Sequence, residues 1–380
     1  MRFCMVTTFY PPWHMGGDAI YVQALARALH HRGHAVEVVH CEDAYRAAGG
    51  SPPTLTLTDD GIVVHRLRHP LGILSPLITQ QTGMPGLKRR KLESLLDRQF
   101  DVIHFHNISL IGGPGVLSLG QAAAKVHTLH DHWMICPTHV LWKNRQRACD
   151  GRTCWTCTVR SGIPPQLWRL GDFTKRQLDE VDVLFAPSEF VASKHRETGI
   201  SRPIEVLPLF SRLDPGPSPR RPAPARPRFI FVGRITASKG IAPLVEMFAG
   251  LSAYELVIAG AGDLRAELQA RFEHQANIRF VGCLDAAGLS ALYASATATI
   301  VPSLAPESLG LVALESFAHG TPVLTFATGG CGDAVHAARA GIVCGDMIEL
   351  RAAVERVARD PAVAAELGRL ARNAFEEKYT

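Results

Sequence analysis

The sequence lacks a membrane-spanning segment, an export signal and a large excess of one charge. No apolar stretch reaches the ~18 residues that a spanning helix needs. The first residues, Met1 to Thr8, form one short apolar run followed by Pro11, without the long apolar core and cleavage site of a signal peptide. We therefore expect a cytoplasmic protein, with peripheral contact at the inner face of a membrane left open.

The charge balance excludes some partners. Lysine and arginine number 40 against 35 acidic residues, and the net charge of +5 suits anionic small molecules or lipid headgroups. It is too small to indicate nucleic acid, and the arginines of segment 211–227 lack the interleaved aromatics of a nucleic-acid surface. The basic run Lys88–Lys91 is either a solvated helix face or a contact to an anionic membrane.

A chain of 380 residues with 47% hydrophobic content is too long for one ordinary core. Strand and helix signals alternate in two series, which predicts an α/β protein with two doubly wound parallel sheets. Within the first series, Val116–Ala124 is predicted to be a helix. The predicted parts are a first domain at 1–210 with a cysteine-rich insert at 131–160, a proline-rich and arginine-rich linker at 211–227, a second domain at 228–365 and a final helix at 366–380.

Two glutamates define a predicted diphosphate-binding site. Seven residues separate Glu307 from Glu315, directly after the apolar run Ala296–Val301. Ser308 is a suitable N-cap for a short helix over Leu309–Phe317, whose free N–H groups and dipole favour an anion. A diphosphate suits this position, with a sugar hydroxyl on Glu307 and ribose hydroxyls on Glu315. A solvated glutamate is the alternative for Glu307 alone, whereas the charge of Glu315 among apolar neighbours needs a partner. The residues predicted to bind the diphosphate compound here, in addition to Glu307, are Ser308, Leu309, Gly310, Leu311 and Glu315.

Two cations complete this site. Arg234 follows the strand-like run Arg228–Gly233, and Lys239 precedes the next helix. The carboxyl ends of parallel strands are where open α/β sheets bind ligands, and two cations facing a helix start make a diphosphate clamp. Gly262, in a glycine-rich turn after the strand Leu256–Ala259, belongs to the same predicted site. Taken alone, these short motifs also fit a solvated turn.

Together the motifs resemble glycosyltransferase family 4, a large family of retaining enzymes with the GT-B fold. Gly16 and Gly17, before the predicted helix Ala19–Arg32, look like the opening loop of that family and are predicted to approach the donor phosphate. The resemblance covers nearly the whole chain and implies two Rossmann-like domains that face each other across a cleft. It also implies that the final helix at 366–380 crosses back to the first domain. The motifs that follow the order of the family are Phe231-Val-Gly-Arg-Ile, Lys239-Gly240, Leu256-Val-Ile-Ala-Gly-Ala-Gly262, Ile278-Arg-Phe-Val-Gly282, Glu307-x7-Glu315 and Gly320-Thr-Pro-Val323.

The resemblance also points to a histidine of the first domain. His130 ends the strand Lys125–His130, where a family histidine contacts the donor sugar close to the reaction centre. His127, inside the same strand, is better explained as a buried core histidine. His106 ends another strand, and we leave it out of the predicted catalytic set.

Four of the nine cysteines fall within 22 residues of the insert 131–160. In a chain without an export signal, such a cluster favours a metal over disulfides. Four thiolates would close a tetrahedral structural zinc site and stabilise an insert with little apolar core. An iron–sulfur cluster matches part of the spacing, and unligated thiols are the third alternative. The predicted ligands are Cys136, Cys149, Cys154 and Cys157.

The predicted reaction moves a sugar from a nucleotide diphosphate sugar, such as a UDP- or GDP-sugar, to an acceptor hydroxyl of a glycan, a glycolipid or a small molecule. Arg234 and Lys239 would stabilise the leaving diphosphate without a catalytic metal, and no Asp-x-Asp motif ends a strand to hold one. Glu307 would orient the sugar, and His130 would stabilise the oxocarbenium-like centre. Retention of configuration is implied by the resemblance. The alternatives are a non-hydrolysing sugar-nucleotide epimerase and a non-catalytic sugar-nucleotide-binding protein.

Overall fold

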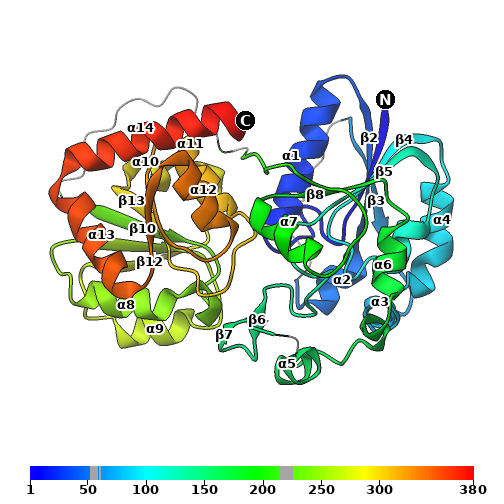
Figure 1. The fold of residues 1–380 in the computed structure, drawn as a ribbon, viewed down its shortest axis with the longest axis horizontal. Coiled ribbons are helices and arrows are strands. Elements are labelled where there is room, and N and C mark those ends of the chain that lie inside the picture. Colours follow the sequence, from blue (N-terminus) through cyan, green and yellow to red (C-terminus); the bar gives the residue numbers. More distant parts are fainter. Residues whose placement is uncertain (52–58, 60, 152, 212, 214–225) are drawn as a thin grey trace. The chain divides into compact units, whose positions relative to one another are not determined.

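A computed structural model describes residues 1–51, 59, 61–151, 153–211, 213 and 226–380 (Figure 1). Its contacts divide the chain into two compact units: unit 1 is Met1–His139 with Thr153–Leu207, and unit 2 is Val140–Arg152 with Pro208–Thr380. Most of the predicted linker lies outside the described residues. The predicted first domain contained the whole insert 131–160, whereas the short hairpin of β6 (Trp142–Lys143) and β7 (Arg147–Ala148) groups with unit 2.

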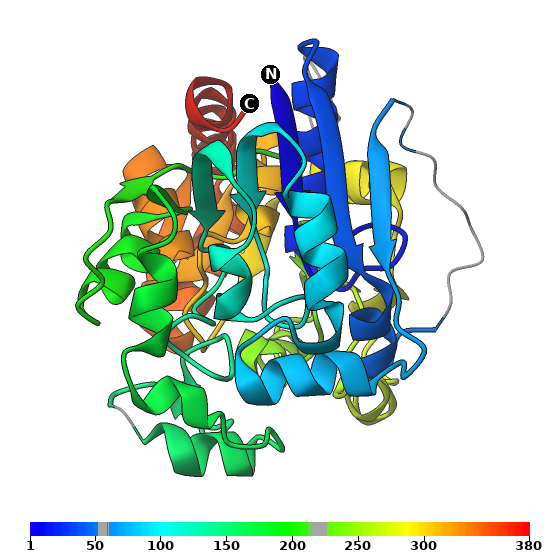
Figure 2. The same cartoon turned by 90° about the vertical axis from the view of Figure 1, so that its right-hand side faces the viewer.

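Unit 1 is built on a seven-stranded parallel sheet with the order β3-β2-β1-β4-β5-β8-β9. The central strand β1 pairs with β2 and β4, so that Met5 lies opposite both Val38 and His104. Near-continuous runs of buried valine and isoleucine are typical of parallel strands covered on both faces. Figure 2 shows these strands side by side, from blue to green. They are β1 (Arg2–Val6), β2 (Ala35–Cys41), β3 (Val63–Leu67), β4 (Phe100–Phe105), β5 (Ala122–Thr128), β8 (Val183–Ala186) and β9 (Ile204–Val206).

The helices of unit 1 cover this sheet. The first helix buries Ala19, Val22 and Ala26, which share one face at helical spacing. The helices and 3-10 turns are α1 (Gly17–His31), α2 (Glu42–Ala47), α3 (Leu74–Thr82), η1 (Gly86–Lys88), α4 (Arg89–Leu96), η2 (Pro114–Ser118), α5 (Cys154–Arg160), η3 (Leu167–Leu170), α6 (Phe173–Leu178) and α7 (Glu189–Arg196).

One predicted element of unit 1 is wrong. Instead of a helix over Val116–Ala124, the chain forms η2, turns at Gly120 with a φ of 72°, and enters β5 at Ala122. Alanine favours helices, but pairing with β4 places Ala122 opposite Phe100 and overrides that weak preference.

Unit 2 contains a six-stranded parallel sheet with the order β12-β11-β10-β13-β14-β15. The central strand β10 pairs with β11 on one side and β13 on the other, so that Ile230 lies opposite both Val257 and Thr299. The strands are β10 (Arg228–Val232), β11 (Glu255–Ala259), β12 (Ile278–Gly282), β13 (Ala298–Val301), β14 (Val323–Phe326) and β15 (Gly341–Cys344).

The last helix of unit 2, α14 (Pro361–Lys378), packs on α11 (Leu311–Ala318), where Arg372 donates to the carbonyl of Ala318 at 2.5 Å. Asp360 separates α14 from the preceding helix α13 (Met347–Arg359). Its backbone is extended, and its carboxylate caps α14 by accepting from Ala362 N at 2.9 Å. The predicted return of this helix to the first domain stays a prediction. The helices of unit 2 are η4 (Ala237–Lys239), α8 (Ile241–Ala249), α9 (Arg265–Arg271), α10 (Ala286–Ser295), α11 (Leu311–Ala318), α12 (Gly330–Ala338), α13 (Met347–Arg359) and α14 (Pro361–Lys378). Among all described helices of the chain, none is both long and apolar enough to cross a bilayer.

Candidate active site

Three loops at the carboxyl ends of the unit 2 strands are joined by backbone hydrogen bonds. In the loop after β10, Ile235 N donates to Ala261 O of the loop after β11 at 2.8 Å. In the loop after β13, Leu304 N donates to Ser238 O at 2.9 Å. We call these three segments the strand-end loops. Because backbone bonds fix their spacing, side chains that project from them are held at defined positions.

The close approach of these loops explains the glycine-rich turn after β11. A Cβ on Gly260 would lie 1.9 Å from Gly233 O, and a Cβ on Gly262 would lie 2.3 Å from Ile235 O. Any larger residue would push the loops apart. Gly262 therefore has a packing role, and its predicted contact with the donor stays a prediction.

Two of the predicted site residues, Lys239 and Glu307, are in direct contact. The ammonium of Lys239 and the hydroxyl of Ser303 both donate to Glu307 Oε1. Burial alone would raise the pKa of Glu307, but Lys239, Ser303 and the nearby exposed Arg234 hold it below its ordinary value. The backbone of Glu307 is also fixed, because Gly330 N donates to its carbonyl at 2.8 Å. The result is an ionised carboxylate in a fixed position beside a cation.

The helix after Glu307 begins later than predicted. Its N-cap is Gly310, with a φ of 83°, and its first residue is Leu311, so the assignment of Ser308 as N-cap is wrong. A left-handed backbone at this point favours glycine over serine, and Ser308 belongs to the preceding loop. The free N–H groups of the helix therefore start at Leu311, whereas Leu309 is a buried loop residue at 3% exposure. The donor contacts predicted for these residues stay predictions.

Glu315 has a partner that the sequence did not reveal. On α11 its Oε2 accepts from the hydroxyl of Tyr293 in α10 at 2.7 Å, and Tyr293 is fully buried. Burial and the neighbouring carboxylate raise the pKa of Tyr293 well above its ordinary value, so the tyrosine keeps its proton and orients Glu315. Tyr293 lies 22 residues earlier in the chain, and only packing between two helices brings it to Glu315.

In unit 1, the predicted glycine pair lies at the start of α1. Gly16 is the N-cap with a φ of 86°, Gly17 is the first helical residue, and both are exposed. Asp18 follows in the first turn and accepts from Asn107 Nδ2 at 3.0 Å. Burial raises the pKa of Asp18. The helix start is therefore open to close approach, and contact with a donor phosphate stays a prediction.

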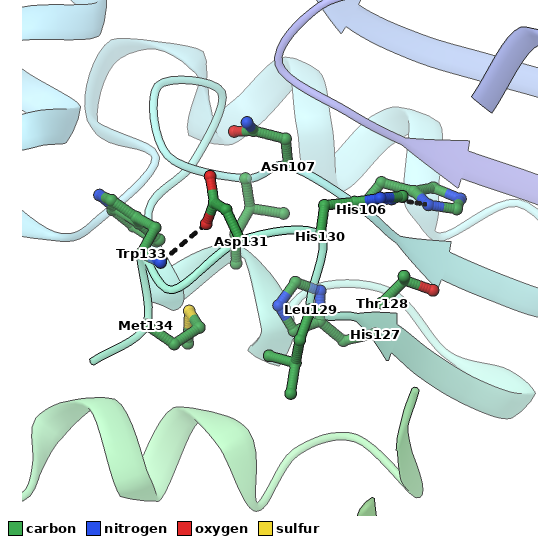
Figure 3. Close-up of a pocket in the computed structure, with 10 residues that line it drawn as sticks. His106, Asn107, His127, Thr128, Leu129, His130, Asp131, Trp133 and Met134 are labelled. Atoms are coloured by element: carbon green, nitrogen blue, oxygen red, sulfur yellow. Dashed lines mark hydrogen bonds between the residues drawn. The ribbon is translucent and has the colours of Figure 1, made fainter. Parts of the chain in front are cut away.

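His130 and His106 are joined in a pocket of unit 1 (Figure 3). The Nε2 atom of His130 lies 2.9 Å from Nδ1 of His106, so one ring donates and the other accepts. His106 stacks on His104 with 3.9 Å between ring centroids. Burial lowers the pKa of His130 to about 4, which leaves a neutral imidazole at neutral pH. His106, which we left out of the predicted catalytic set, is thus the partner that orients His130.

Asp131 is a pocket residue that the sequence reasoning missed. Its Oδ1 accepts from Trp133 N at 2.7 Å (Figure 3). Its Oδ2 lies 2.8 Å from Nδ1 of His139. Burial would raise the pKa of Asp131, but His139 and the Trp133 amide lower it to about 2. An ionised carboxylate therefore follows the neutral imidazole of His130. Its position directly after a strand-ending histidine was the available signal.

Comparison with known proteins identifies the family of this chain. The pattern described as Glycosyltransferase Family 4 matches residues 15–211, just over half of the chain, and the pattern described as Glycosyl transferases group 1 matches residues 226–360. The chain belongs to glycosyltransferase family 4. The predicted resemblance is thereby confirmed, and the protein is a glycosyltransferase.

Individual relatives span nearly the whole of this family 4 chain. Glycogen synthase of Mycobacterium tuberculosis is 29% identical over 405 residues, covering 100% of this chain and 91% of the relative. Sucrose-phosphate synthase from Thermosynechococcus elongatus has a TM-score of 0.73 at 21% identity, covering 100% and 95% of the two chains. Anabaena HepE in complex with UDP-glucose has a TM-score of 0.66 at 15% identity, also covering 100% and 95%. These structures confirm the predicted GT-B fold.

The structure does not support the predicted zinc site in this family 4 glycosyltransferase. In the described residues, which include all nine cysteines, no group of three or more histidine, cysteine or acidic side chains is arranged to hold a metal ion. Cys136 and Cys157 are buried, whereas Cys149 and Cys154 are exposed. The Cys136 thiol lies 3.3 Å from Thr138 Oγ1, and the Cys149 thiol donates to Gly151 O at 3.4 Å. Spacing brings cysteines close along the chain, but it does not fix where their side chains point.

Buried histidines of unit 1 predict a loss of stability in acid. Burial lowers the pKa of His127 and of His132 from 6.5 to about 4. Between these values the unfolded chain binds more protons than the folded one, so the free energy of unfolding falls as the pH falls from 6.5 towards 4. Each such histidine contributes up to ~1.4 kcal/mol per pH unit in this window. Thermal unfolding at pH 7 and pH 5 is therefore expected to show a clear drop in Tm.

A variant at His132 tests this cause. Both ring nitrogens of His132 are buried and make no hydrogen bond within the described structure, so His132→Phe removes a titrating group with little loss of bonding. We expect a smaller drop in Tm between pH 7 and pH 5 for this variant. The exposed His274 is the matched control, and His274→Phe should leave the pH dependence unchanged. An equal pH dependence in the wild type and His132→Phe would contradict the assignment.

Proposed function

We propose that this glycosyltransferase transfers a sugar from a nucleotide diphosphate sugar, either a UDP- or a GDP-sugar, to an acceptor hydroxyl with retention of the anomeric configuration. The observation that carries the proposal is the ion pair of Lys239 and Glu307 in the strand-end loops. A sugar nucleotide needs both charges, since the diphosphate needs a cation and the sugar hydroxyls need an acceptor. The UDP-glucose complex of HepE supports a nucleotide-sugar donor.

The ion pair has bonding capacity left for both parts of the donor. An ammonium has three N–H donors, so Lys239 can keep Glu307 and still bind a phosphate oxygen. In the described part of the chain, Lys239 and Ser303 both use Oε1 of Glu307. We assign Oε2 to a hydroxyl of the transferred sugar. The exposed Arg234 adds a second cation for the diphosphate.

The other predicted residues receive roles in the same proposal. Glu315, oriented by Tyr293, holds the ribose hydroxyls. His130, oriented by His106, contacts the sugar as a neutral imidazole beside the oxocarbenium-like centre. The acceptor oxygen bonds to the anomeric carbon on the face that the diphosphate leaves, the bond from that carbon to phosphate breaks, and the acceptor proton passes to the leaving phosphate.

The acceptor is assigned only by class, as a hydroxyl of a glycan, a glycolipid or a small molecule. A thermal-shift panel of UDP- and GDP-sugars identifies the donor, and an acceptor screen with that donor follows. NMR of the product is expected to show the anomeric configuration of the donor. Conversion of the donor without an acceptor would instead identify an epimerase, and binding without any conversion would identify a binding protein.

Transfer is expected to continue without a divalent metal. Arg234 and Lys239 supply positive charge where a metal would otherwise bind the diphosphate, so activity in EDTA should stay within about twofold of the untreated enzyme. Initial rates with and without the chelator provide the measurement. A loss of activity in EDTA that is restored by Mg²⁺ or Mn²⁺ would contradict the metal-independent part of the proposal.

A further inference from the structure

Helix α3 of unit 1 has its polar and apolar faces reversed. Leu74, Leu77 and Ile78 share one face at helical spacing and are 51%, 43% and 37% exposed. On the opposite face, Ser75 and Thr79 are fully buried. A helix on the surface of a globular protein normally buries its aliphatic face, so the orientation of α3 needs a reason.

A buried lysine fixes this orientation. Lys88 in η1 is 3% exposed, and its Nζ donates to Ser75 Oγ at 3.0 Å and to Thr79 Oγ1 at 3.1 Å. Rotating α3 to bury its leucines would remove both hydroxyls from a buried ammonium, which is costly. The structure therefore corrects the sequence interpretation of Lys88–Lys91, because Lys88 is not part of an exposed basic face but holds the aliphatic face outward.

Neighbouring residues extend the exposed surface. Next to α3, Trp168 of η3 donates from Nε1 to Gln80 O at 2.9 Å, and η3 adds Leu167 and Leu170 at 63% and 77% exposure. Figure 2 shows α3 in light blue, below α4 in cyan. Exposed aliphatic residues that gather on one surface are typical of an interaction site. We call the following six exposed residues the α3 face: Leu71, Ile73, Leu74, Leu77, Ile78 and Leu87.

The charged residues of the segment that carries the α3 face are all positive. From Arg68 to Leu92 the sequence contains no acidic residue. Four basic residues of this segment are exposed: Arg68, Arg89, Arg90 and Lys91. Of these, Arg89 pairs with Glu93 of α4 at 2.7 Å. A second copy of the chain would bring the same cations together, whereas anionic headgroups would neutralise them.

We propose that the α3 face docks on the surface of a bilayer that contains anionic phospholipids. The aliphatic side chains enter the boundary between headgroups and acyl chains, and the flanking arginines bind phosphate groups. The α3 face shares no residue with the strand-end loops or with the lining of the histidine pocket. Its test is therefore independent of the sugar-transfer proposal.

Flotation with lipid vesicles tests the proposal. The full chain is expected to float with vesicles of equal parts phosphatidylglycerol and phosphatidylcholine, and to bind vesicles of phosphatidylcholine alone at least about tenfold more weakly. Leu77→Asp should weaken binding to the anionic vesicles by about tenfold or more, because it places a charge in the inserted face. Arg90→Glu should weaken it by about tenfold and reduce its sensitivity to salt.

Two exposed residues of unit 2 supply matched controls. Ile348→Asp and Arg356→Glu make the same chemical changes at exposed positions of α13, which is not part of the α3 face, and should leave vesicle binding unchanged. Equal binding to both kinds of vesicle, or unchanged binding by Leu77→Asp, would overturn the proposal. So would a dimer of the wild-type chain that Leu77→Asp dissociates while neither protein binds vesicles.

Discussion

Replacement of Glu307 by glutamine is expected to lower kcat/KM by about 10²- to 10³-fold while the protein stays folded, because a fixed charged group that acts in the transition state is lost. Glutamine keeps the size of the side chain but removes the charge that Lys239 faces. It also weakens the acceptor that we assign to a sugar hydroxyl. The measurement is kcat/KM with the donor found in the thermal-shift panel, together with the Tm of the variant.

Two further variants separate this effect from a general loss of charge. Glu246→Gln removes an exposed glutamate of α8 that pairs with Arg271 at 2.9 Å, and it should change activity very little. The double variant of Lys239→Ala and Glu307→Gln should be hardly slower than the slower single variant, because the two residues act as a unit. Retention of more than a tenth of wild-type activity by Glu307→Gln would refute the role given to this carboxylate.

The strand pattern of the chain could be predicted because parallel strands are buried on both faces. Largely apolar runs such as Ala35–Cys41 and Arg228–Gly233 carry that signal. The alanine-rich residues Ala122–Ala124 carry no such signal, since their strand conformation depends on pairing with β4. The sequence therefore predicted those strands whose own residues are apolar. It did not predict a strand whose conformation depends on pairing with a neighbouring strand.

The contacts of the candidate site were also predictable only in part. Lys239 and Glu307 lie 68 residues apart, yet both follow strands of one sheet, and the carboxyl ends of parallel strands meet at one edge. Their association was therefore predictable. The partners Ser303 and Tyr293 were not, because hydrogen bonds between side chains depend on the packing of loops and helices. The direction of the thiols in the cysteine-rich insert depends on packing in the same way.

Replacement of His130 by alanine is expected to lower kcat by about 10²-fold and to lower Tm as well. The loss of activity follows from removing a neutral imidazole that we place beside the oxocarbenium-like centre. The loss of stability follows because Nδ1 of the buried His106 then has no partner, which costs about 1 to 3 kcal/mol. Steady-state kinetics and thermal unfolding measure the two effects separately.

A control variant separates the kinetic effect of His130→Ala from its loss of stability. His195 is fully buried in α7, and its Nδ1 bonds to Val191 O at 2.8 Å, outside the pocket of His130. His195→Ala should lower Tm by a similar amount but leave kcat within about twofold. His106→Ala should slow transfer less than His130→Ala, and the double variant should be no slower than His130→Ala, since His106 acts only by positioning His130. Equal kinetic effects of His195→Ala and His130→Ala would show that the pocket histidine serves stability and not transfer.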